Sequence, residues 1–264
     1  MQSYSAGGKR SLPPRFIWVT GMPRSGSTWV YNVARALVLA GGHPVMPATM
    51  MTNELECIET ANRECARPRQ RGDPTWMFKL HAQLSGSMPD SLLICTYRDP
   101  RDALISYWRF MRCDFPTALE AAVQMTGTID HYRKLPAEAK LDLEYRDIVA
   151  EPVVVAERLA RALGLAVAGD AIAGAVDAFT KSAVQDIIAR REAAGGREAE
   201  PSGATPTDWP NADGSRRIFD PATGFQSGHV SDYVDGQWRA LLGAPEQAQI
   251  DARLGPWLRA NGFA

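Results

Sequence analysis

The 264-residue sequence has few of the features that assign a protein to a class directly. Its only cysteines are Cys57, Cys65, Cys95 and Cys113, and no two of them stand in the C-x-x-C spacing of metal or redox sites. We therefore expect neither a disulfide framework nor a cysteine-based metal site. A reducing compartment fits this cysteine usage best.

Long hydrophobic runs and an excess of one charge are also missing. No apolar stretch approaches the roughly 20 residues that a membrane span needs. Residues 1–14 are polar, without the hydrophobic centre of a secretion signal. The net charge of −1 gives no general basic field for nucleic acid. These absences predict a cytoplasmic protein with no membrane span and no nucleic-acid partner.

What the sequence does contain is an alternation of buried strands and amphipathic helices. Apolar, β-branched runs predict strands, and a period near 3.6 residues predicts helices. The expected strands are residues 16–20, 76–80, 91–97 and 141–145, and the expected helices are residues 28–40, 102–111, 118–133, 152–163 and 247–258. Such alternation is typical of a three-layer α/β fold, with a mostly parallel central sheet and helices on both faces.

We expect residues 1–264 to form a single domain with two long departures from this pattern. Residues 43–73 are rich in Met, Pro and charge and contain one expected short helix, at about 53–65. Residues 191–217 are rich in Gly, Ala, Pro and Ser, which predicts a flexible loop. Long loops in compact domains are often functional, so both segments are candidates for the substrate side of a site.

The most informative segment is residues 16–28, FIWVTGMPRSGST. A strand, a glycine-containing loop and a helix N-terminus form an anion cradle, because loop amides and the helix dipole favour negative charge. The loop from Gly21 to Thr28 is spelled G-x-x-x-x-G-S-T, with Ser27 where the Walker A motif of nucleotide triphosphatases has lysine. The nearest basic residue is Arg24, inside the loop. The sequence thus predicts a P-loop-like phosphate site without the lysine that an NTPase uses.

A second anion site is predicted at residues 97–108, YRDPRDALISYW. Arg98 follows the strand at 91–97, and Ser106 lies on the next helix. Arginine offers a permanently charged, planar set of donors and serine offers a hydroxyl. Ligands of α/β proteins bind at the carboxyl ends of the strands, so both anion sites are expected at the same edge of the sheet.

With two anion sites in this order, the chain resembles the sulfotransferases that use 3′-phosphoadenosine 5′-phosphosulfate (PAPS). Their phosphosulfate loop is similar to residues 22–29, MPRSGSTW, and their 3′-phosphate segment to residues 97–108. A K-x-H element matches residues 78–81, FKLH, and a YED-like element matches residues 145–147, YRD. The resemblance spans about residues 16–165.

The resemblance implies which residues bind PAPS and its product, adenosine 3′,5′-bisphosphate (PAP). The 5′-phosphate would be held by Arg24, Ser25, Gly26, Ser27 and Thr28, the adenine by Trp29 and Tyr145, and the 3′-phosphate by Arg98 and Ser106, with amides of Ser227, Gly228 and His229. No metal is implied, because the donor has no β/γ-triphosphate to neutralise, in contrast to a kinase substrate.

The resemblance also implies three catalytic residues. His81 would remove the proton of the acceptor hydroxyl, since histidine titrates near working pH. Arg24 would stabilise the charge that develops on the bridging oxygen as the sulfuryl group leaves. Lys79 would assist Arg24 in neutralising that charge.

The C-terminal part departs from the family pattern. The family has a basic R-K-G segment and a later G-x-W, which close over the 3′-phosphate. Here Gln226 and Ser227 replace the two basic residues, while Gly228 and Trp238 are present. Positive charge would then come from Arg216 or Arg217 in the preceding loop.

The predicted function is sulfuryl transfer from PAPS to a hydroxyl of a small-molecule, lipid or glycan acceptor. A P-loop small-molecule kinase and a non-catalytic nucleotide-binding scaffold are the alternatives. Methionine and aromatic residues in residues 43–73 and after Ser106 favour an acceptor with an apolar body. The arginines of the first segment would suit an acidic or glycan acceptor instead: they are Arg63, Arg67, Arg69 and Arg71. The oligomeric state is not predicted.

Overall fold

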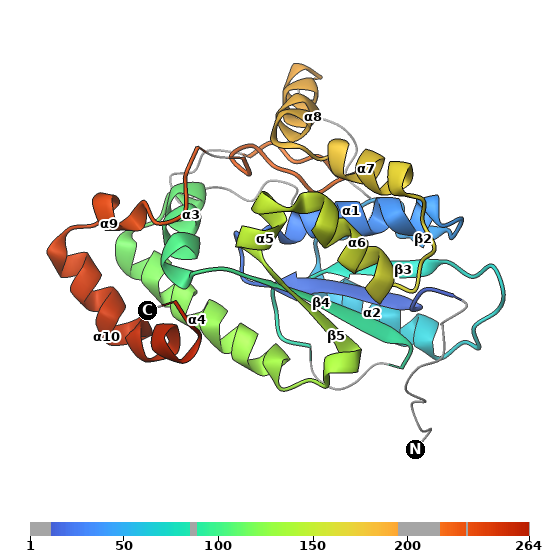
Figure 1. Cartoon of the computed structure of the whole chain (residues 1–264), viewed down its shortest axis with the longest axis horizontal. Helices are drawn as coiled ribbons and strands as arrows, with labels where there is room; N and C mark the ends of the chain where they lie inside the picture. The colour runs from blue at the N-terminus through green and yellow to red at the C-terminus, as the bar shows by residue number, and fades with distance from the viewer. Residues whose placement is uncertain (1–11, 85–88, 195–216, 231, 264) are drawn as a thin grey trace.

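The computed structural model describes residues 12–84, 89–194, 217–230 and 232–263. At its centre is one parallel sheet with the strand order β2-β3-β1-β4-β5 (Figure 1). Its strands are β1 (Phe16–Gly21), β2 (Val45–Met46), β3 (Thr75–Lys79), β4 (Ser91–Tyr97) and β5 (Lys140–Glu144). The predicted fold class and four predicted strands are confirmed. β2 was not predicted, because two residues are too few to show an alternating pattern.

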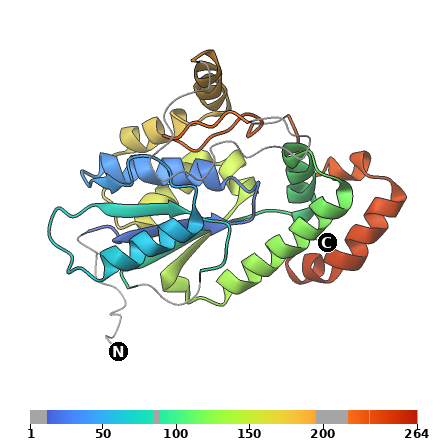
Figure 2. The same ribbon diagram turned by 180° about the vertical axis from the view of Figure 1, so that it is seen from behind.

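Helices cover both faces of the sheet (Figures 1 and 2). One face is covered by α1 (Ser27–Ala40) and α6 (Pro152–Ala162), with α5 (Tyr145–Ala150) and α7 (Gly169–Asp177) beside them. The other face is covered by α2 (Glu54–Cys65) and α4 (Phe115–Arg133). The remaining helices are α3 (Pro100–Met111), α8 (Lys181–Ala193), α9 (Trp238–Leu241), α10 (Ala244–Ala260) and the 3-10 turn η1 (Ala137–Ala139). None of the helices in the described ranges is long and apolar enough to cross a membrane.

The central strand β1 is buried along its whole length, and its side chains alternate between the two faces. Ile17 and Val19 belong to the core formed with α1 and α6. Phe16 and Trp18 belong to the opposite core, which includes side chains of α2. This burial on both faces explains why β1 is a continuous apolar run in the sequence.

Two sequence-based boundaries need correction, and two helices were not predicted. Residues 191–193, expected to begin a flexible loop, continue helix α8, while residues 195–216 lie outside the described part of the chain. Tyr145, expected to end a strand, is the first residue of α5. Helices α7 and α8 were not predicted: α7 is rich in Gly and Ala, and α8 buries only Val184. Helix α8 has no broad apolar face, which is the signal that periodicity depends on, and the buried face of the nine-residue helix α7 is short: Ile172, Ala175 and Val176.

Candidate active site

The loop after β1 is held against the end of β4. Gly21 has a φ of 121°, and a Cβ at this position would lie 2.0 Å from the carbonyl oxygen of Thr96, so only glycine fits. The amide of Met22 donates to the same carbonyl over 2.9 Å. The hydroxyl of Ser25 lies 2.6 Å from both the Met22 carbonyl and the Thr96 hydroxyl. The Ser25 hydroxyl therefore fixes the loop, so only its backbone amide is left for a phosphate.

Helix α1 begins directly after this loop, as a P-loop-like fold requires. Its N-cap is Gly26, in the left-handed region at φ 85°, and no side chain caps the helix. A Cβ on Gly26 would lie 3.2–3.3 Å from side-chain atoms of Ile148 and Tyr145. The first turn contains no acidic residue. In the described part of the chain, no side chain caps the N-terminal amides of α1, which is the arrangement that binds phosphate or sulfate groups.

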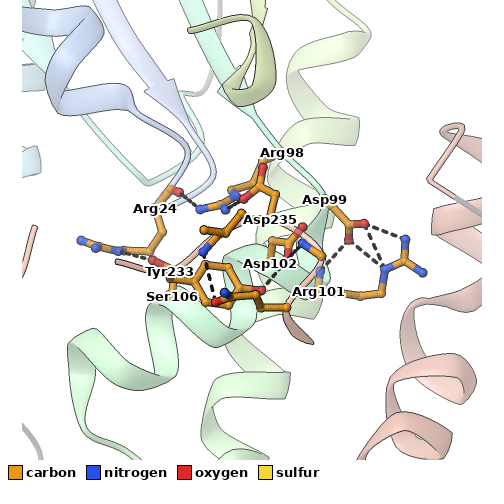
Figure 3. A network of polar contacts seen from close by, with 11 residues as sticks. Arg24, Arg98, Asp99, Arg101, Asp102, Ser106, Tyr233 and Asp235 are labelled. Atoms are coloured by element: carbon orange, nitrogen blue, oxygen red, sulfur yellow. Dashed lines mark hydrogen bonds and ion pairs between the residues drawn. The ribbon is translucent and has the colours of Figure 1, made fainter. Parts of the chain in front are cut away.

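Arg24 links three parts of the chain at this edge of the sheet (Figure 3). Its Nε donates to the Ser106 hydroxyl over 3.0 Å, and one terminal nitrogen lies 3.3 and 3.2 Å from the carbonyl oxygens of Gly228 and His229. Its guanidinium lies 4.2 Å from the centre of the Phe110 ring. Burial, assisted by a neighbouring guanidinium, lowers the Arg24 pKa to about 10. Arg24 therefore stays cationic at neutral pH.

Arg98 is the most deeply buried cation at the site, with 4% of its surface exposed. It donates to the Arg24 carbonyl over 2.9 Å and forms an ion pair with Asp235 (Figure 3). Its guanidinium stacks on the Tyr145 ring at 4.1 Å. Its Nε is buried and has no hydrogen-bond partner among the residues that the structure describes. A buried N–H without an acceptor is costly, so Arg98 has unused capacity for an anion.

The N-terminus of α3 holds the C-terminal segment in place. Asp99 caps this helix by accepting from the Arg101 amide over 2.9 Å. Asp102 accepts from the Tyr233 hydroxyl and, over 2.8 Å, from the Gly236 amide (Figure 3). Burial raises the pKa of Asp102. These contacts bring residues 232–236 to the place where Asp235 meets Arg98.

His81 and Lys79 lie at the end of β3, with 2.9 Å between Lys79 Nζ and His81 Nε2. His81 Nδ1 lies 3.4 Å from the Gly21 carbonyl oxygen. A carbonyl can only accept, so the Nδ1 atom carries the proton and Nε2 offers its lone pair to the lysine. Burial and the Lys79 charge lower the His81 pKa to about 3, far from the near-neutral value expected from the sequence. Burial lowers the Lys79 pKa to about 8.

The loop that contains residues 227–229 folds over the same edge. Ser227 is tied to Ile218 by two hydrogen bonds of 2.9 and 3.0 Å. His229 Nδ1 accepts from the Gln226 amide over 3.1 Å, and its ring stacks on Phe110 with 5.3 Å between centroids. Arg217 also lies on the Phe110 ring, at 4.0 Å. Arg216, the other predicted cation, lies outside the described residues.

The structure brings most of the predicted site residues together at the carboxyl ends of β1, β3 and β4. The group comprises Arg24, Ser25, Gly26, Lys79, His81, Arg98, Ser106, Tyr145, Gly228 and His229. Trp29 is half-buried and packs against the main core. Within the described ranges, no group of three or more His, Cys, Asp or Glu side chains could hold a metal ion.

The sequence analysis missed Glu54, Asp102 and Asp235, whereas Phe110 is one of the aromatic residues after Ser106 that it assigned to the acceptor side. Glu54 accepts from the backbone amides of His81 and Ala82. It stands directly after the N-cap of α2, where acidic residues are common for reasons of the helix dipole alone. The pattern therefore gave no sign that Glu54 contacts the site.

Comparisons with known proteins identify the family and agree with the fold. A family model described as a sulfotransferase domain matches residues 14–191. The solved structure of retinol dehydratase with androsterone and PAP aligns with a TM-score of 0.58 and 15% identity, over 94% of this chain and 81% of that one. A mouse sulfotransferase, SULT7A1, complexed with PAP aligns with a TM-score of 0.59 and 14% identity, over 96% and 85%. No curated protein matches the sequence. Because the family model covers more than half of its length, the chain belongs to the sulfotransferase family.

Proposed function

We propose that this protein transfers the sulfuryl group of PAPS to a hydroxyl of a small-molecule, lipid or carbohydrate acceptor and releases PAP. The observation that carries the proposal is the convergence of cations from separate segments on one edge of the sheet. Arg24, Lys79 and Arg98 lie there with the uncapped N-terminus of α1. A ligand with phosphate groups at both ends of a nucleoside would match two such sites.

The residues present fit the 3′-phosphate of this donor. The Nε of Arg98 is buried without a hydrogen-bond partner among the described residues. The Ser106 hydroxyl, on α3, accepts a hydrogen bond from Arg24 Nε. At the other end, the backbone conformation of Gly26 opens the first amides of α1 to a 5′-phosphate. Tyr145, under Arg98 and beside Gly26, lies between the two sites and is suited to contact the adenosine.

PAPS, when bound, supplies a sulfur atom activated by its phosphate leaving group. Arg24 and Lys79 would neutralise the charge on that leaving group. His81 would take the hydroxyl proton on Nε2, which lies 2.9 Å from Lys79 Nζ. A nearby polyanion favours the protonated forms of lysine and histidine and attracts the ammonium, so Nε2 becomes available and its pKa rises.

The structural neighbours support the choice of ligands. Both retinol dehydratase structures contain PAP, one with androsterone and one with retinol. At 15% identity, this likeness concerns the fold. The androsterone and retinol bound in those two structures are hydroxyl-bearing molecules with an apolar body, the class of acceptor proposed here.

The test is calorimetric titration of the purified protein with PAP and, separately, with ADP plus Mg²⁺. We expect binding of PAP in the micromolar range or tighter and little response to ADP. Preference for ADP with Mg²⁺ would overturn the proposal in favour of a kinase. Binding of PAP without transfer of ³⁵S from labelled PAPS to a panel of phenols, sterols and glycans would favour the nucleotide-binding scaffold.

A further inference from the structure

Glu54, the first residue of α2, contacts the backbone just after β3. Its Oε1 accepts from the His81 amide over 2.5 Å, and both carboxylate oxygens lie within 3.3 Å of the Ala82 amide nitrogen. Hydrogen bonds from amides to a carboxylate are stronger than those to a neutral acceptor. The chain direction at His81 is therefore set by a side chain from the segment of residues 43–73.

Glu54 also supplies negative charge beside a group of cations. Lys79 interacts electrostatically with Glu54 on α2, with Arg24 in the phosphate loop, with His81 at its own strand end and with His229 in the C-terminal loop. Among these four neighbours, Glu54 is the only acidic residue. Its charge raises the pKa of Lys79, which burial and Arg24 lower.

We infer that Glu54 is a positioning residue, which holds His81 in place through the main chain and provides the carboxylate that faces Lys79. The catalytic roles of His81 and Lys79 rest on the proposed function. The contacts of Glu54 are made to the protein's own amides, so its role can be tested without PAPS or an acceptor.

The first test measures hydrogen–deuterium exchange at the His81 and Ala82 amides in the full chain. Glu54→Ala removes the acceptor, and we expect exchange at both amides to accelerate about tenfold or more, since each loses a charge-assisted bond. Glu54→Gln keeps an acceptor oxygen and should stay within about threefold of the wild type. Glu56→Gln, on the exposed side of the same helix, is the matched control. Unchanged exchange in Glu54→Ala would overturn the inference.

The second test measures the titration of Lys79 by competitive labelling with acetic anhydride between pH 6 and 10. In Glu54→Gln the fold is kept and the charge is lost, so we expect the Lys79 pKa to fall by about one unit. A purely structural role would leave it unchanged. An equal pKa in the wild type, Glu54→Gln and Glu56→Gln would contradict the electrostatic part of the inference.

A separate observation, at Arg98, carries a second inference. The guanidinium is paired with Asp235, whose side chain is 42% exposed, while Arg98 itself is almost fully buried. Asp235 is held there because Tyr233 and Gly236, on either side of it, both bind Asp102. A carboxylate thus occupies part of the donor set that a 3′-phosphate would use.

We propose that Asp235 is a competing anion, which PAP must displace from Arg98 and which returns to favour release of PAP. This proposal rests on the proposed function, because it requires Arg98 to bind the 3′-phosphate. A ligand without that phosphate would leave the Arg98–Asp235 ion pair intact, so its affinity should not depend on Asp235. The effect should therefore depend on one phosphate group of the ligand.

The test compares calorimetric titrations of the wild type, Asp235→Asn and Asp232→Asn with PAP and with adenosine 5′-phosphate. Asp232 is the matched control, because it pairs with Lys181 at the surface of the same segment. In Asp235→Asn we expect PAP to bind about fivefold or more tightly, as for typical coupled contacts, and adenosine 5′-phosphate to bind as in the wild type. Wild-type PAP affinity in Asp235→Asn would refute the competition. No binding of PAP by any of the three proteins would instead overturn the proposed function.

Discussion

The cations at the end of β3 and at the end of β4 have different partners. At the end of β3, Lys79 donates to a neutral histidine, and its nearby carboxylate, Glu54, is bound to backbone amides. At the end of β4, Arg98 is ion-paired with Asp235 and stacked on Tyr145. At the end of β3, burial lowers the pKa of the Lys79 ammonium to about 8, although the charge of Glu54 opposes this shift.

This difference indicates that the end of β3 and the end of β4 are suited to different chemical roles. Lys79 and His81 have lowered pKa values, so their protonation can respond to a ligand that arrives with negative charge. Arg98, in contrast, is a buried guanidinium paired with a carboxylate that is 42% exposed. The β3 end is therefore suited to proton movement and charge neutralisation, and the β4 end to recognition of an anion.

The substitution His81→Ala gives the strongest test of these separate roles. We expect the rate of ³⁵S transfer from labelled PAPS to fall about a hundredfold or more, the usual scale for loss of a general base. PAP affinity, measured by calorimetry, should stay near that of the wild type, because His81 lies at the end of β3 and is not one of the residues proposed to bind the two phosphates of PAP. Transfer close to the wild-type rate would remove His81 from the mechanism.

Arg98→Ala addresses the opposite end. Loss of a charged hydrogen-bond donor should weaken PAP binding about tenfold or more, whereas adenosine 5′-phosphate should bind as before. The measurement is calorimetric titration with both nucleotides. Equal weakening for both would show that Arg98 does not discriminate the 3′-phosphate.

The pH dependence should separate the two ends further. Lys79 is cationic below its pKa of about 8 and neutral above it, so kcat/KM for PAPS should fall as the pH rises through that value. Lys79→Arg keeps its charge above pH 8 and should remove this fall. A pH profile with the same alkaline decline in Lys79→Arg would assign the decline to another group.

The smallest expected effect concerns Gly26, in the loop between β1 and α1. Gly26→Ala should cost about 1 kcal/mol of folding free energy from its left-handed backbone, measured by urea denaturation. It should also weaken PAP binding, because the new Cβ meets Tyr145 and Ile148. Gly72→Ala has a similar φ of 92° with no atom within 4 Å, so it should share only the loss of stability.

The sequence by itself determined four of the five strands and the loop between β1 and α1, and it predicted most of the residues that gather at the candidate site. β1 is an apolar run that ends at a glycine, and the following helix starts where the loop pattern predicts. Parallel strands place their carboxyl ends together, so Arg24, Lys79 and Arg98 could be assigned to one edge of the sheet. These features depend on local pattern and on a simple topological rule.

Only the tertiary structure decided how these side chains are paired. Glu54 and His81 are 27 positions apart, and Arg98 and Asp235 are 137 apart. Contacts over such separations leave no periodic signal, because they depend on how separate elements pack. The protonation of Lys79 and His81 was likewise set by burial and neighbouring charge, which only the folded chain creates.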